Sequence, residues 1–172
     1  QMSIEQYLND YSPLKSHLPG DSLPWLQAIR QEAFAAFTER GFPSLREEDW
    51  RYTKLTALDK TVFQSVQDMA VDLEWLGDIR LPDAYHLVMV NGNFCPEASD
   101  SLPAELNCCS LRQALVQQPY QVAEYLGKAL PDAEHGLISF NTAWFSDGIW
   151  LEASKSLVLD KPCLLYTSPS PR

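Results

Sequence analysis

The segment at residues 42–55, FPSLREEDWRYTKL, constrains the fold most, because it follows a strong helix stop and mixes aromatic with charged side chains. Gly41 can take the left-handed conformation that ends a helix, and Pro43 cannot continue one. Ser44 can cap a new turn, and the acidic residues 47–49 would then lie near its positive N-terminal end. The sequence therefore predicts a helix that ends at Gly41 and a short turn that follows it.

The aromatic residues of this segment have two interpretations. Trp50, Tyr52 and Leu55 can form an apolar anchor that ties a helical arm to the rest of the chain, because buried aromatic side chains contribute much of a protein core. Alternatively, Trp50 and Tyr52 beside Arg51 and Lys54 can stack on an aromatic or sugar ligand, since an aromatic face with a nearby cation suits such ligands. We favour the anchor and keep a free-standing ligand-binding module as the alternative.

The composition is that of a globular domain with an acidic surface. Of the 172 residues, 45% are hydrophobic and 11% aromatic, so the chain can bury a core. The formal net charge of −10 repels phosphate backbones. No apolar run approaches the roughly 20 residues of a membrane span, and the N-terminus has no basic region followed by an apolar one. We expect a cytoplasmic protein that binds neither nucleic acid nor membrane.

Residues 163–172, CLLYTSPSPR, are a special case. The DNA string TGT CTC TTA TAC ACA TCT CCG AGC CCA CGA, which is similar to a transposase sequencing adapter, translates into this sequence. We therefore expect these residues to be a translated adapter that packs poorly. Without Arg172 the formal charge changes from −10 to −11. The remaining cysteines have no C-x-x-C spacing, and we expect reduced thiols.

Two helices are predicted before the segment at residues 42–55. The first covers residues 4–11, has its apolar residues on one face and should stop before Pro13. The second covers residues 23–40, with Ser22 as a cap and Pro24 in its first turn. We expect Trp50 to be buried against the apolar stripe of this second helix. The stripe consists of Trp25, Ile29, Ala33 and Phe37, widened by Leu26 and Ala36.

A β-hairpin is the clearest prediction in the middle of the chain. Residues 86–96, HLVMVNGNFCP, place an apolar run before Asn91 and Gly92, the preferred dipeptide of a tight hairpin turn. Before it, residues 57–80 give mixed signals, with a strand or turn near 62–66 and a short helix near 73–79. After it, we expect a short strand at residues 106–109.

The rest of the chain alternates helical and strand patterns. A helix capped by Ser110 should close at Pro119, and another should stop at Pro131. Residues 136–145 form a segment with a buried pattern, followed by a turn at Asp147 and Gly148. Strand-like patterns at residues 149–153 and 157–159 come last.

Four segments resemble the SufB/SufD family of iron–sulfur cluster assembly proteins. EDWRYTKL at residues 48–55 is similar to the pattern EDW(K/R)YT-x-L near the N-terminus of the SufD members. FNTAWFSDG at residues 140–148 is similar to LN-x-A-(F/W)-(F/W)-x-DG, with Phe140 in place of the usual Leu. VLDKP at residues 158–162 is similar to the end of a first strand, V-x-L-x-x-P, and VNG at residues 90–92 matches a further segment.

This resemblance implies an α+β fold. N-terminal helices would be followed by a small α/β unit with a β-hairpin, leading into the first strands of a truncated parallel β-helix. The expected limits are 1–56 for the helical arm and anchor, 57–154 for the α/β unit, 155–162 for the start of the β-helix and 163–172 for the adapter. The family also implies a non-enzymatic subunit that works with SufB and the ATPase SufC, through regions absent from this chain.

The chain offers few candidates for chemistry of its own. Cys108 and Cys109 can be proposed as a thiol or metal site, but adjacent cysteines are poorly placed to hold one ion, and free cysteine is usually a small buried apolar residue. His17, His86 and His135 are dispersed and form no metal-binding spacing.

The remaining sequence motifs also give no indication of an active site. The acidic residues 47–49 can bind a divalent cation, yet three adjacent acids more often begin a solvated helix. No phosphate-binding loop, dinucleotide-binding turn or nucleophile elbow occurs in the sequence. We therefore expect no enzyme and no catalytic, metal-binding or cofactor-binding residue in this fragment, with the iron–sulfur cluster handled by the full complex.

Overall fold

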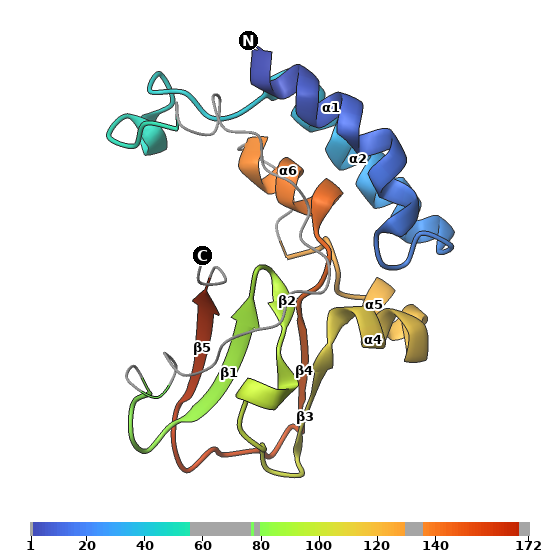
Figure 1. Ribbon diagram of the computed structural model, residues 1–172. Coiled ribbons are helices and arrows are strands. Elements are labelled where there is room, and N and C mark those ends of the chain that lie inside the picture. Colours follow the sequence, from blue (N-terminus) through green and yellow to red (C-terminus); the bar gives the residue numbers. More distant parts are fainter. Residues whose placement is uncertain (1, 56–76, 78–79, 130–135, 169–172) are drawn as a thin grey trace. The chain divides into compact units, whose positions relative to one another are not determined.

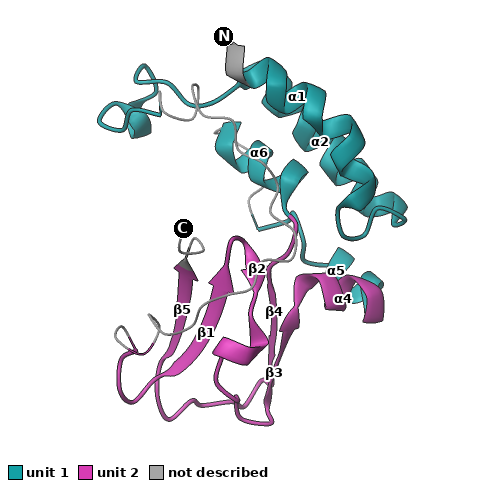
Figure 2. Ribbon diagram, viewed as in Figure 1, with its two compact units in different colours: residues 1–64, 118–145 teal, residues 65–117, 146–172 magenta. Residues whose placement is uncertain are grey.

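The computed structural model describes residues 2–55, 77, 80–129 and 136–168. The chain divides into two compact units, residues 1–64 with 118–145 and residues 65–117 with 146–172 (Figure 2). Each unit therefore combines separate stretches of the sequence. Helices dominate the described part of the first unit, and the strands lie in the second (Figure 1). The predicted α+β class is confirmed, whereas the predicted domain limits stay predictions.

The two predicted N-terminal helices are confirmed. α1 (Met2–Leu14) includes Pro13 in its last turn, so the prediction that it stops before Pro13 is wrong. The Pro13 carbonyl finds other partners, because Ser16 Oγ donates to it at 3.2 Å and His17 Nδ1 lies 3.1 Å away in the short helix η1 (Lys15–His17).

α2 (Pro24–Arg40) follows Leu23, which takes the cap position expected for Ser22 and makes no side-chain cap bond. Proline at the first helical position costs no hydrogen bond, so the helix can start without a polar cap. Gly41 ends the helix with φ 68°, as predicted.

The core of the first unit joins α2 to α6 (Gly136–Trp144), a helix that the sequence showed only as a buried segment. Phe37 is fully buried, and its ring centroid lies 5.0 Å from that of Phe140 and 5.5 Å from that of Trp144. α1 joins this core through Tyr11, which stacks on Phe34 at 4.4 Å. These helices bury one aromatic cluster between them.

Phe42, rather than Trp50, is the residue of the 42–55 segment that covers Phe37, with ring centroids 5.1 Å apart. Trp50 lies in the short helix η2 (Glu48–Trp50) and is only half-buried, so the prediction that it is buried against the stripe of α2 is wrong. The reason is that α6 already covers the stripe of α2, and Phe42 is nearest to the helix end.

Arg30 is a charged residue inside this core, with an exposed fraction of 4%. Its Nη1 donates to the Ala143 carbonyl at 2.8 Å, and its Nη2 donates to the carbonyls of Pro19 and Phe145, both at 3.1 Å. The guanidinium also lies 3.9 Å from the Phe145 ring centroid. Burial lowers the pKa of Arg30 to about 10, so the side chain stays charged at neutral pH and binds the carbonyl end of α6.

In the second unit, β1 (Tyr85–Val90) and β2 (Asn93–Phe94) form the predicted hairpin. Asn91 and Gly92 have φ values of 50° and 79°, as this turn requires. β1 also pairs in parallel with β5 (Cys163–Ser168), giving the order β2-β1-β5. A separate antiparallel pair consists of β3 (Leu106–Ser110) and β4 (Ile149–Ala153).

Three short helices complete the described chain: η3 (Pro96–Ala98), α4 (Leu111–Gln117) and α5 (Pro119–Ala123). Ser110 caps α4 as predicted, since its Oγ accepts the Gln113 N–H at 3.0 Å. Pro119 was expected only to close a helix, but it also begins α5, because its fixed φ suits a first helical position. α5 ends well before Pro131, and Gly127 follows with φ 78°.

The expected start of a β-helix at residues 155–162 contains no strand; these residues link β4 to β5, and Val158 is 89% exposed. The mixed signals at residues 57–80 fall almost entirely outside the described residues.

The expectation that residues 163–172 pack poorly is wrong for β5. Its residues pair with the whole of β1, and the Tyr166 ring stacks on His86 with centroids 5.5 Å apart. An open strand edge offers unpaired backbone groups, which accept any segment of suitable β propensity. The pairing does not depend on where the residues came from, so their origin as a translated adapter stays a prediction.

Phe37→Ala should lower the free energy of unfolding by about 3–5 kcal/mol, because it leaves a cavity among the rings of Phe42, Phe140 and Trp144. Urea denaturation followed by circular dichroism measures the change. Tyr120→Ala is the matched control, since Tyr120 is 84% exposed and its loss should cost no more than about 0.5 kcal/mol. Equal losses for the two variants would contradict the packing described above.

A chain that ends at Pro162 should be less stable than the full chain by more than about 1 kcal/mol, because it loses the partner strand of β1 and the ring contact of Tyr166. The control is a chain that ends at Ser168, which keeps β5. Thermal and urea unfolding of the three chains give the comparison. Identical stability of all three would show that β5 adds nothing to the fold.

Candidate functional site

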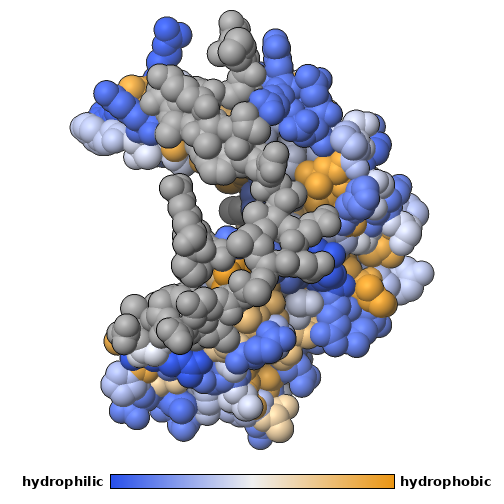
Figure 3. Space-filling view, viewed as in Figure 1, coloured by the Kyte–Doolittle hydropathy of each residue, from blue (hydrophilic) through white to orange (hydrophobic). Residues whose placement is uncertain are grey.

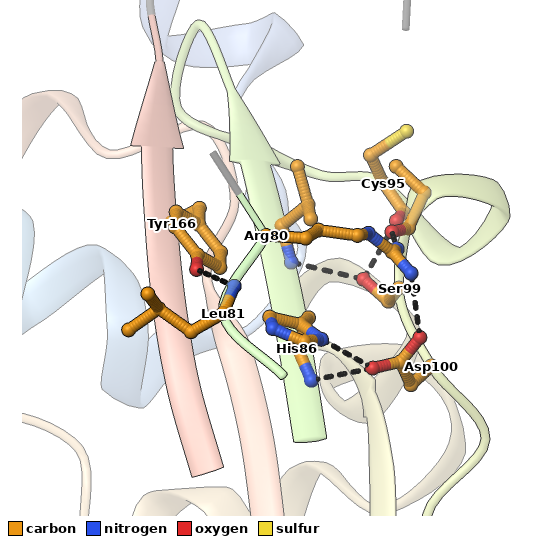
Figure 4. Close-up of polar contacts among 9 residues, drawn as sticks. Arg80, Leu81, His86, Cys95, Ser99, Asp100 and Tyr166 are labelled. Atoms are coloured by element: carbon orange, nitrogen blue, oxygen red, sulfur yellow. Dashed lines mark hydrogen bonds and ion pairs between the residues drawn. The ribbon is translucent and has the colours of Figure 1, made fainter. Parts of the chain in front are cut away.

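A polar cluster in the second unit joins β1 to the segment after η3 (Figure 4). The Asp100 Oδ2 accepts the His86 backbone N–H at 2.8 Å and lies 2.6 Å from His86 Nδ1. In return, the Asp100 backbone N–H donates to the His86 carbonyl at 2.8 Å. Arg80 Nη1 lies 3.0 Å from the other carboxylate oxygen, Oδ1. The cluster thus fixes this segment along the strand.

Neighbouring contacts extend the cluster. Arg80 Nη2 donates to the Ala98 carbonyl at 2.6 Å. Ser99 Oγ accepts the Val88 N–H at 2.9 Å and donates to the Cys95 carbonyl at 2.8 Å. Each of these polar groups therefore binds the backbone of an adjacent element.

The environment of Asp100 lowers its pKa below the ordinary value of 3.8. Burial is the largest single influence and acts in the opposite direction, because it disfavours the charged form. The side-chain and backbone hydrogen bonds of His86, together with the charge of Arg80, outweigh it. Asp100 is therefore a carboxylate at neutral pH.

His86 has some of the features of a metal-binding or general-base histidine. A carboxylate bound to Nδ1 is the arrangement that orients such a ring, and His86 is only 5% exposed. Its Nε2 has no hydrogen-bond partner among the described residues. In the same part of the chain, however, no three His, Cys, Asp or Glu side chains are grouped so as to hold a metal ion. The described residues therefore leave this site incomplete.

Cys108 and Cys109 are neighbours on β3, opposite Leu151 and Trp150 of β4. Successive residues of a strand point to opposite faces of the sheet, so the two thiols diverge. Burial raises the pKa of both thiols, which disfavours the thiolate that metals and electrophiles require. The structure therefore does not bring these cysteines together as a site.

The other predicted candidates are also separate. His17 is exposed and bonds locally at the end of α1, and His135 lies outside the described residues. Glu47 Oε1 accepts the Ser44 N–H at 2.8 Å, and Glu48 forms an ion pair with Arg51 at 2.8 Å. These two carboxylates thus serve the turn itself, and the predicted cap by Ser44 is confirmed by the bond from the Arg46 N–H to Ser44 Oγ at 3.3 Å.

Trp50 and Tyr52 differ sharply in exposure. Trp50 is half-buried, whereas Tyr52 is 85% exposed. The Arg51 guanidinium lies 4.7 Å from the centroid of the Tyr52 ring. An exposed tyrosine with an adjacent cation is therefore present, and Trp50 is the less exposed of the two aromatic side chains.

A groove of about 330 Å³ lies in the second unit. Its walls include the apolar side chains of Leu87, Phe94 and Leu106, and its polar lining includes Ser99 and Asp100. The side-chain oxygens of both polar residues already bind other groups of the protein. The groove therefore presents no unengaged Ser99 or Asp100 side chain to a ligand.

Asp147 holds a second polar junction that the sequence showed only as a turn. Its Oδ2 accepts the Phe94 N–H and its Oδ1 accepts the Arg112 N–H, both at 3.0 Å. Arg112 Nη2 also donates to the Ser146 carbonyl at 2.9 Å. Gly148 packs closely beside it, because a Cβ there would lie 3.2 Å from the Leu111 side chain, which would have to shift slightly.

Sequence reasoning missed Arg30, Arg80, Asp100 and the partners of Asp147, because their partners are distant in the chain and mostly backbone groups. The Asp-Gly pair after an aromatic run was the one local signal for Asp147. The described part of the chain is an α+β module whose polar clusters hold its own elements together.

The chain belongs to the family described as SufBD protein N-terminal region, which it matches over residues 1–165. A curated relative from Synechocystis sp. strain PCC 6803 is named iron–sulfur cluster assembly SufBD family protein slr0076. It is 28% identical over 155 residues, and the match covers 77% of this chain and 34% of the relative. The chain therefore spans about a third of the length of this relative. Within its described residues, every helix is too short or too polar to cross a bilayer.

Asp100→Asn should change how stability depends on acidity. The pKa of Asp100 is lower in the folded than in the unfolded protein, so the carboxylate stabilises the fold at pH values above the ordinary pKa of 3.8. This contribution is lost as the pH falls through the folded pKa. The wild type should therefore lose more stability than Asp100→Asn between about pH 5 and pH 2. Urea midpoints across this range give the measurement, with the exposed Asp10→Asn as control. Parallel curves for the wild type and Asp100→Asn would contradict the cluster described here.

Proposed function

We propose that this chain is the N-terminal part of a SufD-like subunit of the SUF iron–sulfur cluster assembly complex. The observation that carries the proposal is the family match over residues 1–165, together with a relative whose name places it in iron–sulfur cluster assembly. The similarity of residues 48–55 to the SufD pattern favours SufD over SufB.

In this proposal the region has a structural role and performs no chemistry of its own. The polar groups of Arg30, Asp100 and Asp147 support this role, because each binds backbone atoms of neighbouring elements. The raised pKa of Cys108 and Cys109 and the divergence of their side chains also favour it. The cluster is cargo of the whole complex, and this region holds no cofactor.

The partners proposed for the whole subunit are SufB and SufC, in the cytoplasm. In this family they are engaged through the β-helix and the C-terminal domain. The chain covers 34% of its relative, so most of such a subunit lies outside the sequence described here. The N-terminal region would then shape and stabilise the start of the subunit.

The complete gene provides the direct test. The parent DNA is read past the codon of Pro162, and the full-length product is co-expressed with SufB and SufC. Co-purification of all three in a fixed ratio is the expected result. A full-length chain that purifies without SufB, or a stop codon directly after Pro162, would contradict the proposal.

The chain as it stands should not bind a stoichiometric iron–sulfur cluster, because a cluster normally needs about four converging thiolate or imidazole ligands. Anaerobic reconstitution with iron and sulfide, followed by the absorption spectrum and iron analysis, measures this. Cys108→Ser is the control for adventitious binding, and it should leave the spectrum unchanged. A stoichiometric cluster that Cys108→Ser abolishes would make the cysteine pair a functional site.

A further inference from the structure

The groove of about 330 Å³ in the second unit lies beside an edge of β3 that the polar clusters do not use. We propose that this edge and the groove bind an extended, basic peptide segment of a partner protein, which pairs with β3 as an added strand. The proposal goes beyond the assembly role described above and does not depend on which complex the chain serves.

The pairing of β3 with β4 determines which backbone groups of β3 remain available. At one end of the pair, the Ser154 N–H donates to the Glu105 carbonyl at 3.1 Å. At the other end, the Leu111 N–H donates to the Gly148 carbonyl at 2.8 Å. Hydrogen-bonded pairs recur at every second residue of an antiparallel ladder, and the register is continuous between these two bonds. The odd-numbered residues of β3 therefore bond to β4, and the N–H and C=O of Cys108 point to the opposite edge.

This opposite edge of β3 is open at Cys108. Among the described residues, the backbone N–H and C=O of Cys108 have no hydrogen-bond partner. The Leu106 N–H points to the same edge and donates to the Pro103 carbonyl at 2.9 Å, which leaves the Leu106 C=O as a further acceptor. The strand has no Lys or Pro, the residues that commonly protect an edge from pairing. The edge can therefore accept another extended segment.

The groove follows this open edge. Leu106, Asn107 and Cys108 all line it, although successive side chains of a strand point to opposite faces. A groove that reaches all three residues lies along the edge of the strand, and β4 occupies the other edge. Leu87 and Phe94 supply apolar walls, and the volume is near the lower end of the usual range for ligand sites. A few residues of an extended peptide fit such a space.

Main-chain recognition suits the surface of this protein. Hydrophilic residues cover much of the face drawn in Figure 3, and its apolar residues form small separate groups. Apolar residues scattered in this way are ordinary and mark no docking patch. A peptide that adds a strand gains its affinity from main-chain hydrogen bonds and needs only small pockets for alternate side chains. The engaged side chains of Ser99 and Asp100 do not prevent this mode of binding.

The charge beside the groove favours a basic partner. Residues 81–111 include no Lys or Arg. Glu97 and Glu105 are exposed, adjoin lining residues in the sequence and form no ion pair among the described residues. Asp100 also lines the groove, but Arg80 lies 3.0 Å from its carboxylate and compensates its charge. Two uncompensated carboxylates on a chain of net charge −10 attract a basic segment and repel a second copy of the chain.

The test uses the whole chain and a phage-displayed library of random peptides. Enriched peptides should combine Lys or Arg with apolar residues at alternate positions, because alternate side chains of an added strand face the groove. Fluorescence anisotropy then measures the affinity of one such synthetic peptide. Its binding to the wild type should weaken with added salt.

N-methylation of the peptide backbone tests the main-chain pairing without altering the protein. The carbonyls of Cys108 and Leu106 would accept two peptide N–H groups that are two residues apart. Methylation of either nitrogen should weaken binding by at least about tenfold, because it removes a hydrogen bond and leaves an acceptor unpaired. Methylation of the nitrogen between them, which points away from β3, should change the affinity by no more than about twofold.

A bulky substitution locates the site on the protein. Ser101 is exposed and lines the groove, so Ser101→Trp should fill it and weaken peptide binding by at least about tenfold. Ser156→Trp adds the same ring at an exposed position that does not line the groove, and it should bind within about twofold of the wild type. Unchanged thermal unfolding of Ser101→Trp excludes a folding defect.

A pair of charge reversals tests the electrostatic part of the proposal. Glu97→Lys with Glu105→Lys should weaken binding of the basic peptide by at least about tenfold. Glu32→Lys with Glu39→Lys changes the net charge equally at exposed positions of α2. This control should bind within about twofold of the wild type.

Three outcomes would overturn the proposal. The first is a selection that enriches no basic, apolar peptide, or enriches peptides whose binding survives Ser101→Trp. The second is an affinity that N-methylation changes equally at every position, because this would assign the binding to side chains. The third is a dimer of the chain, measured by analytical ultracentrifugation, that Ser101→Trp abolishes, because this would assign the edge to a second copy.

Discussion

The packing of α6 on α2 is the contact on which the rest of the first unit depends. It buries Phe37 against Phe140 and Trp144, and it places Arg30 against the Ala143 carbonyl, 113 positions away in the sequence. A buried guanidinium is stable only where acceptors surround it, and the carbonyl end of a helix supplies them. The apolar cluster and the buried charge therefore stabilise the same helix pair, and neither α2 nor α6 has its apolar side covered without the other.

In the second unit, carboxylates take the place of the aromatic cluster as the link between elements. Asp100 ties a loop to β1, and Asp147 ties β2 to the start of α4. Both accept hydrogen bonds from backbone N–H groups. Such charge-assisted hydrogen bonds compensate the cost of removing a carboxylate from water. In the described residues of this unit, the acidic side chains therefore stabilise the ends of the small sheets through backbone hydrogen bonds.

Local signals in the sequence predicted the local structure well. Gly41, Asn91 with Gly92, and Ser110 each do what their residue type favours, because turns and caps depend on a few adjacent residues. The sequence did not indicate that α6 covers the stripe assigned to Trp50, or that β5 pairs with β1. Both are contacts between distant segments, and neither helical periodicity nor β propensity identifies the partner. The polar clusters were missed for the same reason. No local sequence pattern around His86 or Asp147 identifies the distant groups to which these side chains bind.

The interleaving of the two units has a consequence for synthesis on the ribosome. The first unit needs residues 118–145, so it remains incomplete until the whole of the second unit's first stretch, residues 65–117, has left the exit tunnel. During that interval the apolar side of α2 lacks α6. The first unit can be completed only after residue 145, and the second only after residues 146–172 follow, so the nascent chain exposes aromatic surface to chaperones for longer than a chain whose domains follow one another.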